Sequence, residues 1–283
     1  MPDLKSGNAA IPNPELGENF AAVKSASKTR DRLSWIRSMF IFDPLIYVYT
    51  IVLGTLSLIS SLFDRKGRMQ HRFARAWSWL ILKTTLCPVQ IVGEERLLGR
   101  ASSVYAVNHV SAFDIPTLYT QLPFQFRIMA KKELFRYPFL GWHLRRSGQL
   151  PIDQQNPGSA IRSLKRAVDS LLKGMPLVIF PEGGRSATGQ IQPFMTGAFY
   201  IAIKAKADIV PMALVGTYEI LKMNTFHIHP GPIKLVVGEP ISTAGYSLRN
   251  MDALALRVQK AIEDLYYSYS AVPDPRRAAK AGT

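Results

Sequence analysis

The sequence has a single cysteine, Cys87, among 283 residues. One cysteine excludes an internal disulfide framework and a zinc site built from cysteine thiolates. Histidine adds little, because His227 and His229 form a His-x-His pair with no third ligand nearby, which is more typical of a strand edge than of a metal site. The sequence therefore predicts no metal site and no bound cofactor.

Acidic side chains are scarce, since 20 Asp and Glu stand against 35 Lys and Arg, for a net charge of +15. An excess of this size favours an anionic membrane surface, an anionic substrate or nucleic acid as a partner. Zinc-finger spacing, an RNP-type signature and a long Lys/Arg block are all missing, and each is typical of proteins that bind nucleic acid. We therefore expect a membrane phospholipid surface or an anionic substrate, and no nucleic-acid partner.

The first 30 residues lack hydrophobic periodicity and are rich in Asn, Pro, Gly, Ser and Lys. This composition predicts a disordered tail over residues 1–30. The apolar run that follows starts too late for a secretory signal peptide and has no small-residue cleavage site.

Charge is missing altogether from positions 44–63, a run of twenty residues. This is the length of a membrane-spanning helix, and a core helix rarely needs so many uncharged positions. Basic residues flank the run on both sides, whereas a simple span carries them on one side. The stretch 73–83 then has two Trp beside basic residues, as interfacial helices do. We predict a two-helix membrane anchor over residues 31–87, which spans the membrane or dips into one leaflet, with a buried core helix as the alternative.

The pattern changes near residue 88 to apolar strands that alternate with amphipathic helices. Such alternation predicts an α/β domain over residues 88–271, with a mostly parallel mixed sheet covered by helices on both faces. The basic tail 272–283 is expected to be mobile. The predicted strands are 89–92, 104–107, 126–129, 148–153, 177–180, 209–215 and 233–237. The main predicted helices are 156–173, 194–207 and 250–269, and a further helix is expected from Lys131 toward Trp142.

A polar turn follows the strand 104–107 directly. Asn108 and His109 end the strand, and Ser111 and Asp114 then indicate a turn into a helix. An Asp carboxylate can accept from one imidazole nitrogen and leave the other free to take a proton. His109 and Asp114 are therefore candidates for a general base and the group that orients it. The spacing is also that of an ordinary capping box with Ser111 at the cap.

A second polar turn follows the strand 177–180 and reads Pro181-Glu-Gly-Gly-Arg-Ser186. Two glycines allow a tight turn with exposed backbone N–H groups, and Arg185 offers a planar fork for a phosphate. The turn is no P-loop, because it lacks the Lys-Ser/Thr ending. An ordinary glycine-rich turn with a solvated Arg is the alternative reading.

Parallel sheets bind ligands outside the carboxyl ends of their strands. If the strands before His109 and Glu182 run the same way, a proton acceptor and a phosphate holder lie on one rim. Lys131 follows a third strand and would add positive charge there. A base, a phosphate site and a membrane anchor together favour chemistry on a phosphate-bearing lipid.

The two turns resemble the NHxSxxD and FPEGTRS motifs of the glycerolipid acyltransferases, the family that makes phosphatidic acid from 1-acylglycerol-3-phosphate. The resemblance covers about residues 88–241, and the predicted anchor is similar to that of the family. The segments that carry it are Asn108–Asp114, Ala130–Leu134 with Pro138 and Gly141, Phe180–Ser186, and Val210-Pro211.

This resemblance implies a membrane enzyme that moves a fatty acyl group from acyl-CoA or acyl carrier protein to the sn-2 hydroxyl of lysophosphatidic acid. His109 would take the proton, Asp114 would hold the imidazole, and the active site would face the cytoplasmic leaflet, as the basic flanks of the anchor indicate. Ser111 is discounted as a nucleophile. The expected substrate-binding residues are Lys131, Glu182, Gly183, Gly184, Arg185 and Ser186.

Two positions depart from the family pattern. Gln154 stands where the family usually has an Arg assigned to acceptor binding, and Gly184 replaces the usual Thr. The first departure leaves open another lysophospholipid, or glycerol-3-phosphate, as the acceptor. A non-catalytic protein that binds membrane surfaces is the alternative from another class.

Overall fold

The computed structural model describes residues 32–64, 66–97 and 102–277. Their strands form one mixed sheet of seven, in the order β1-β7-β6-β2-β5-β3-β4. Neighbours from β6 to β4 are parallel, β7 is antiparallel to β6, and β1 is parallel to β7. The strands are β1 (Val89–Val92), β2 (Val104–Val107), β3 (Arg127–Lys131), β4 (Leu150–Ile152), β5 (Leu177–Ile179), β6 (Ile209–Val215) and β7 (Ile233–Val237).

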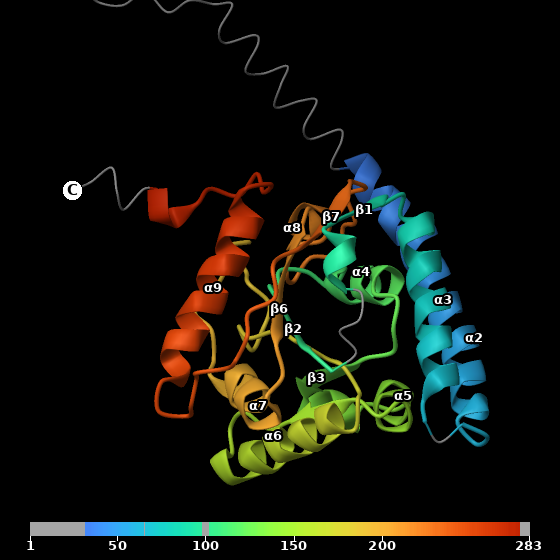
Figure 1. Ribbon diagram of the computed structural model, residues 1–283. Coiled ribbons are helices and arrows are strands. Elements are labelled where there is room, and N and C mark those ends of the chain that lie inside the picture. The colour runs from blue at the N-terminus through green and yellow to red at the C-terminus, as the bar shows by residue number, and fades with distance from the viewer. Residues whose placement is uncertain (1–31, 65, 98–101, 278–283) are drawn as a thin grey trace, which may run out of the picture.

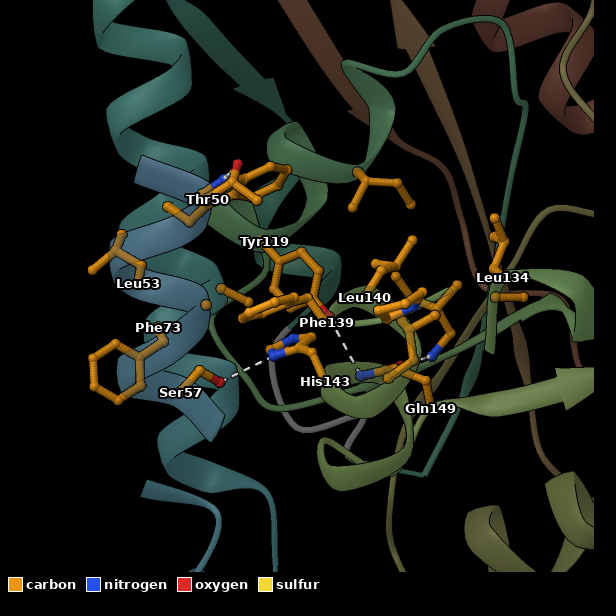
Figure 2. Close-up of a pocket in the computed structure, with 18 residues that line it drawn as sticks. Thr50, Leu53, Ser57, Phe73, Tyr119, Leu134, Phe139, Leu140, His143 and Gln149 are labelled. Atoms are coloured by element: carbon orange, nitrogen blue, oxygen red, sulfur yellow. Dashed lines mark hydrogen bonds between the residues drawn. The ribbon is translucent and has the colours of Figure 1, made fainter. Parts of the chain in front are cut away.

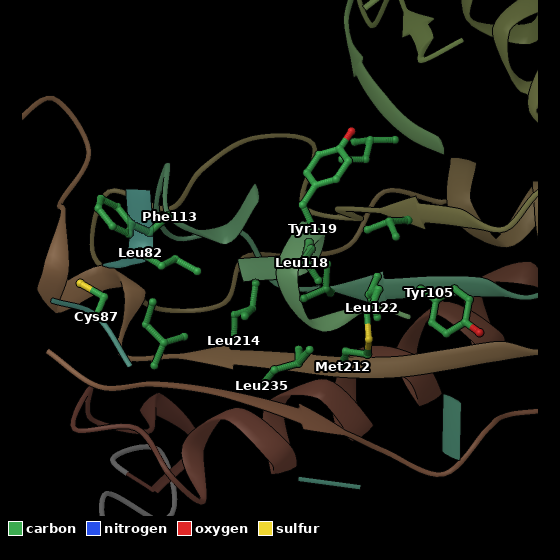
Figure 3. Close-up of a cluster of buried hydrophobic side chains, with 14 of the residues drawn as sticks. Leu82, Cys87, Tyr105, Phe113, Leu118, Tyr119, Leu122, Met212, Leu214 and Leu235 are labelled. Carbon is green, nitrogen blue, oxygen red and sulfur yellow. The ribbon is translucent and has the colours of Figure 1, made fainter. Parts of the chain in front are cut away.

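Helices cover both faces of the sheet, as the sequence predicted (Figure 1). The central strand β2 is completely buried, and its side chains alternate between two hydrophobic clusters. Tyr105 and Val107 face the cluster that includes residues of α3 and α4, part of which Figure 3 shows. Val104 and Ala106 face the cluster under α6, α7 and α9. The helices concerned are α3 (Arg68–Thr84), α4 (Asp114–Gln121), α6 (Pro157–Leu172), α7 (Gly197–Ala205) and α9 (Met251–Tyr267).

Helix α6 illustrates how local sequence sets the boundaries of an element. The Asn156 side chain accepts a hydrogen bond from the Ser159 amide at 3.0 Å, and Pro157 occupies the first turn. Gly174 has φ of 81° just beyond the last turn, a conformation that glycine adopts at low cost. The predicted helix therefore forms between the predicted start and stop.

Shorter elements differ from the prediction. The single helix expected from Lys131 toward Trp142 is divided into the 3-10 helix η3 (Lys132–Arg136) and α5 (Leu140–Arg146). The break falls at Pro138 and at Phe139, whose φ is 59°. The further short helices η2 (Glu94–Leu97) and α8 (Thr217–Ile220) were not predicted.

The predicted anchor forms a helical hairpin along one side of the sheet (Figure 1). Its first arm runs through the π-helix η1 (Ser38–Phe42) into α2 (Asp43–Ser60), and α3 is the second arm. Within the described residues, one helix, Arg32–Ser60, is long and apolar enough to cross a membrane, by length and composition. Only 6% of its most apolar stretch is buried inside the protein. A buried core helix is therefore wrong for this arm, and the membrane role of the hairpin stays a prediction.

The start of the C-terminal tail contacts α9, contrary to the expected mobility from residue 272. Arg276 forms ion pairs with Glu263 and Asp264 of α9, and its guanidinium lies over the ring of Tyr267. Residues 1–31 and 278–283, which hold the rest of the two predicted tails, lie outside the described part of the chain.

Candidate active site

The candidate site lies at the carboxyl ends of three neighbouring parallel strands. Strand β2 pairs with β5, and β5 pairs with β3, all in parallel. His109 follows β2, Glu182 follows β5, and Lys131 is the last residue of β3. The structure therefore brings the two polar turns and Lys131 to one rim, as predicted.

The His109 imidazole is bound by Asp114. Its Nδ1 lies 2.7 Å from Asp114 Oδ2, and its ring stacks on Phe180 with centroids 4.1 Å apart. The same carboxylate oxygen accepts the backbone N–H groups of Val110 and Ser111, each at 2.9 Å. The His109 side chain is 18% exposed, and its Nε2 makes no hydrogen bond to the described residues. That nitrogen is free to take a proton from a bound hydroxyl.

Glu182 lies behind the histidine rather than in the open site. Its Oε1 accepts the His109 amide at 2.6 Å, and its Oε2 accepts the Gln192 amide at 2.9 Å. Burial raises the pKa of Glu182 to about 8, while the two amide bonds act in the opposite direction. Each oxygen accepts a backbone N–H, so Glu182 holds the turn 108–114, which carries His109, and its contact with a substrate stays a prediction.

Two further side chains fix the same turn. Asn108 bridges β2 to β6, because its amide accepts the Leu214 N–H at 2.7 Å and donates to the Leu214 carbonyl at 3.0 Å. The Ser111 hydroxyl is buried and donates to the Leu221 carbonyl at 2.8 Å. Helix α4 begins at Asp114 after Phe113, but the contacts of the expected capping box form in the turn before it: Ser111 Oγ accepts the Phe113 N–H at 3.3 Å, and Asp114 accepts the Ser111 N–H. Ser111 also ties the turn to the loop after α8.

The glycine-rich turn after β5 is shaped by close contacts. Gly183 has φ of 72°, a backbone conformation that other residues rarely adopt, and a Cβ there would displace the Met195 side chain, so a larger residue would strain this turn. Gln154 Nε2 donates to the Gly183 carbonyl at 3.2 Å. The residue that departs from the family pattern therefore borders this turn. Gly184 leaves space on the side of Lys131, whose Nζ would lie 3.8 Å from a Cβ at that position.

The remaining predicted ligands differ in accessibility. Arg185 and Lys131 are exposed and form no ion pair with the described residues, so both cations are available to an anion. Ser186 is fully buried, its amide donates to the His109 carbonyl at 2.8 Å, and its hydroxyl faces Thr188. Ser186 therefore joins the two turns, and its expected role in substrate binding stays a prediction. No metal-binding group of three or more His, Cys, Asp or Glu occurs among the described residues.

The structure also contains an apolar pocket, which was not predicted as such. It has a volume of about 460 Å³ and lies between the helical hairpin and the sheet (Figure 2). Its lining includes Ile115 and Ala130, the neighbours of Asp114 and Lys131 in sequence. Its walls come from α2, α3, α4, β3 and the η3–α5 segment, which are distant in sequence, and no local pattern marks them.

The wall of the pocket contains one polar link between the hairpin and the α/β domain. Ser57 Oγ of α2 lies 3.0 Å from His143 Nδ1 of α5 (Figure 2). Burial lowers the pKa of His143, which favours a neutral imidazole in this apolar setting.

Comparisons with known proteins agree with the geometry. The family model described as Acyltransferase matches residues 88–215. The chain is 35% identical over 180 residues to the 1-acyl-sn-glycerol-3-phosphate acyltransferase of Limnanthes alba, covering 63% of this chain and 62% of that protein. It is 34% identical over 160 residues to the enzyme of that name from Bacillus subtilis (strain 168), covering 56% of this chain and 76% of that protein.

The fold is shared with a solved structure, that of the 1-acyl-sn-glycerophosphate (LPA) acyltransferase PlsC from Thermotoga maritima. The TM-score is 0.72 at 22% identity, and the likeness covers 86% of this chain and 99% of the other. The chain spans less than two thirds of the Limnanthes alba protein and of its relative from Cocos nucifera, of which 57% is covered. The matched family model and the Bacillus subtilis relative, together with the turns at His109 and Glu182, lead to one assignment: the chain belongs to the 1-acyl-sn-glycerol-3-phosphate acyltransferase family.

Proposed function

We propose that this protein transfers a fatty acyl group from a thioester to the sn-2 hydroxyl of 1-acylglycerol-3-phosphate, giving phosphatidic acid. The observation that carries the proposal is the His109–Asp114 pair at 2.7 Å, with the second imidazole nitrogen open. The names of the Limnanthes alba and Bacillus subtilis relatives support the acceptor.

The chemistry requires no covalent enzyme intermediate, because a thioester is already activated. His109 takes the proton of the acceptor hydroxyl as its oxygen attacks the thioester carbonyl. The new C–O bond forms, the C–S bond breaks, and the proton passes from His109 to the departing thiolate. Asp114 holds the imidazole and stabilises its positive charge during the transfer. No cofactor is needed beyond the acyl donor, which is acyl-CoA or acyl carrier protein.

Arg185 and Lys131 are the proposed ligands of the acceptor phosphate. Both are exposed cations at the rim of the sheet, next to the turn that carries the base. An Arg guanidinium binds a phosphate with two parallel hydrogen bonds, and a Lys ammonium adds a point charge. Gly183 and Gly184 allow the backbone of the turn to approach this anion closely.

The apolar pocket is the proposed site for a fatty acyl chain. A lining of aliphatic and aromatic side chains suits a hydrocarbon, and the pocket takes its walls from α2, α3, α4, β3 and the η3–α5 segment. The exposed apolar surface of the Arg32–Ser60 helix supports membrane attachment, and the basic flanks favour the cytoplasmic leaflet.

The first test is an acyl-transfer assay with 1-acylglycerol-3-phosphate and acyl-CoA on membranes that contain the protein. We expect phosphatidic acid from the wild type, and a loss of about a hundredfold to ten-thousandfold in kcat for His109→Ala. The variant is expected to keep its melting temperature within a few degrees, because His109 is partly exposed. Full turnover by a folded His109→Ala protein would contradict the mechanism.

A second acceptor is favoured by one observation. Gln154 contacts the glycine-rich turn at the Gly183 carbonyl, where the family usually has an Arg. A neutral side chain there weakens phosphate binding, so another lysophospholipid or glycerol-3-phosphate is the alternative acceptor. An assay of several acceptors, each with acyl-CoA and with acyl carrier protein as the donor, identifies the preferred acceptor as the one with the highest kcat/KM.

A further inference from the structure

Aromatic side chains are exposed on the segment Leu134–Arg146, which contains η3 and α5. Tyr137, Phe139 and Trp142 are 60%, 56% and 51% exposed, and the Phe139 and Trp142 rings contact each other with centroids 5.6 Å apart. A soluble surface seldom gathers large aromatic groups in so short a segment without a partner. The exposed rings of Tyr137, Phe139 and Trp142 therefore indicate a binding partner.

Charge on the segment identifies the kind of occupant. Residues 134–146 include three arginines and no Asp or Glu. Arg136 and Arg146 are exposed and form no ion pair with the described residues, whereas Arg145 donates to the Phe135 carbonyl. Aromatic rings next to unpaired cations match the interface of an anionic bilayer, where the rings lie at headgroup level and the cations meet lipid phosphates.

The segment continues the exposed apolar surface of the helical hairpin. Helix α5 packs against α2 through the Ser57–His143 hydrogen bond, and the pocket takes walls from both. In Figure 2, Leu53 and Phe73 of the hairpin lie across from Phe139 and Leu140. The two apolar surfaces therefore meet at the pocket.

Backbone strain distinguishes the segment from an ordinary surface loop. Phe139 has φ of 59° and ψ of −65°, a conformation that is costly for any residue other than glycine. It follows Pro138, is more than half exposed, and also belongs to the lining of the pocket. Strain of this kind persists where the surrounding structure holds a side chain in a functional position.

We propose that residues 134–146 form a second membrane-docking surface, which binds an anionic phospholipid bilayer beside the hairpin and sets the mouth of the pocket at the lipid interface. The purpose of this surface rests on the acyl transfer proposed above, but membrane binding itself can be measured without turnover. An acyl chain or lysolipid would then pass from the bilayer to the pocket without crossing water.

The direct test attaches an environment-sensitive fluorophore to single cysteines in a Cys87→Ala background. Tyr137→Cys reports on the segment, Phe40→Cys on the apolar N-terminal helix, and Leu256→Cys on the exposed face of α9, across the sheet from the hairpin (Figure 1). With vesicles of phosphatidylcholine and phosphatidylglycerol, we expect blue-shifted emission at positions 137 and 40 and none at 256. An unshifted label at 137 beside a shifted label at 40 would overturn the proposal, as would unshifted labels at both.

Vesicle binding by variants separates the two contributions. Tyr137→Ser/Trp142→Ser should weaken binding roughly tenfold on all vesicles, because apolar area no longer enters the bilayer. Arg136→Gln/Arg146→Gln should weaken binding about fivefold per charge, and only where phosphatidylglycerol is present. The matched control, Arg162→Gln/Arg166→Gln on α6, should bind as the wild type does. If the Arg162/Arg166 control and the Arg136/Arg146 variant lost the same binding affinity, the effect would come from net charge, and a local docking surface would be refuted.

Activity separates this proposal from the catalytic one. The Tyr137→Ser/Trp142→Ser variant should keep its kcat on a short-chain, water-soluble acceptor and lose activity on vesicle-borne acceptor in proportion to its binding. Wild-type rates on vesicles from a variant that binds them weakly would contradict the proposed entry route. The His109→Ala assay tests the chemistry by itself, whatever these vesicles show.

Discussion

A single carboxylate oxygen organises the turn 108–114, which carries the proposed base. Asp114 Oδ2 accepts from His109 Nδ1 and from the amides of Val110 and Ser111, while Oδ1 is buried without a partner among the described residues. The Asp114→Asn variant can keep these three bonds with its amide oxygen. It loses only the negative charge that stabilises the imidazolium.

Asp114→Asn is therefore expected to lower kcat by about a hundredfold or more while KM for the acceptor changes little. The free energy of unfolding should change by only about 1–3 kcal/mol, because one buried amide group is left unpaired. Steady-state kinetics and urea denaturation measure the two effects. An unchanged kcat in the folded variant would remove Asp114 from the mechanism.

Glu182 predicts a dependence of stability on pH. Burial raises its pKa from 4.5 to about 8, so the folded state binds a proton that the unfolded state has released. The contribution of Glu182 to stability is therefore complete at pH values below 4.5, the pKa of the unfolded state, and is lost as the pH rises toward the folded-state pKa of about 8. The slope approaches about 1.4 kcal/mol per pH unit in that window. Urea denaturation at a series of pH values between 4.5 and 8 measures it.

Glu182→Gln is the matched control for this window, because its amide cannot titrate. We expect the variant to be less stable than the wild type at pH 5, since one of the two backbone N–H groups loses its acceptor. Its stability should also fall less between pH 5 and 8. Parallel curves for the two proteins would show that another group accounts for the pH dependence.

The sequence predicted the contact between His109 and Asp114 but not the residues that support it. The spacing from His109 to Asp114 suffices for a turn into a helix, so the contact follows from local geometry. Glu182 reaches His109 across 73 positions, because β5 pairs with β2. That pairing also buries Ser186, which the motif alone offered as a ligand.

At the scale of elements, α2 forms one wall of the pocket, and Gly54 leaves a gap in it. A Cβ at Gly54 would meet nothing within 4 Å, and the residue lines the pocket. Gly54→Leu is expected to fill this space and exclude long acyl chains. The kcat/KM should fall for long-chain donors or acceptors and stay near the wild-type value for short ones, as competition assays with mixed chain lengths would measure.

Val52→Leu is the control for Gly54→Leu, because it adds volume to the same helix at a position that is 50% exposed and outside the pocket lining. It should leave the chain-length profile unchanged. A uniform loss at all chain lengths in Gly54→Leu would indicate a distorted helix instead of a shortened pocket.

Strand positions were predictable where apolar runs are bounded by Gly or Pro, as at 209–215 and 233–237. The direction of each strand was harder to predict, because the same alternating pattern suits a parallel or an antiparallel strand. The prediction of a mostly parallel mixed sheet is confirmed, but the antiparallel strand β7 carries no mark of its own. The pocket likewise depends on the packing of the hairpin against β3 and α5, which periodicity does not encode.

At the scale of the whole molecule, the long N-terminal helix is tied to the α/β domain near both ends. Ser38 at its start accepts the Ile228 amide at 2.9 Å, and Ser57 near its end contacts His143 at 3.0 Å. These two attachments are roughly 28 Å apart at the usual helical rise. This separation nearly equals the hydrocarbon thickness of a bilayer.

A helix that crossed the membrane would therefore place one attachment, and the polar domain around it, inside or beyond the hydrocarbon. Buried charge there is costly, and the α/β domain has basic residues next to His143, including Arg145 and Arg146. We expect the helix to lie in the plane of one leaflet. Arg32→Cys and Lys66→Cys, at the two ends of the first arm, should then both react with a membrane-impermeant maleimide from the same side of sealed vesicles. Reaction from opposite sides would establish a span, and the domain would have to separate from one end of the helix.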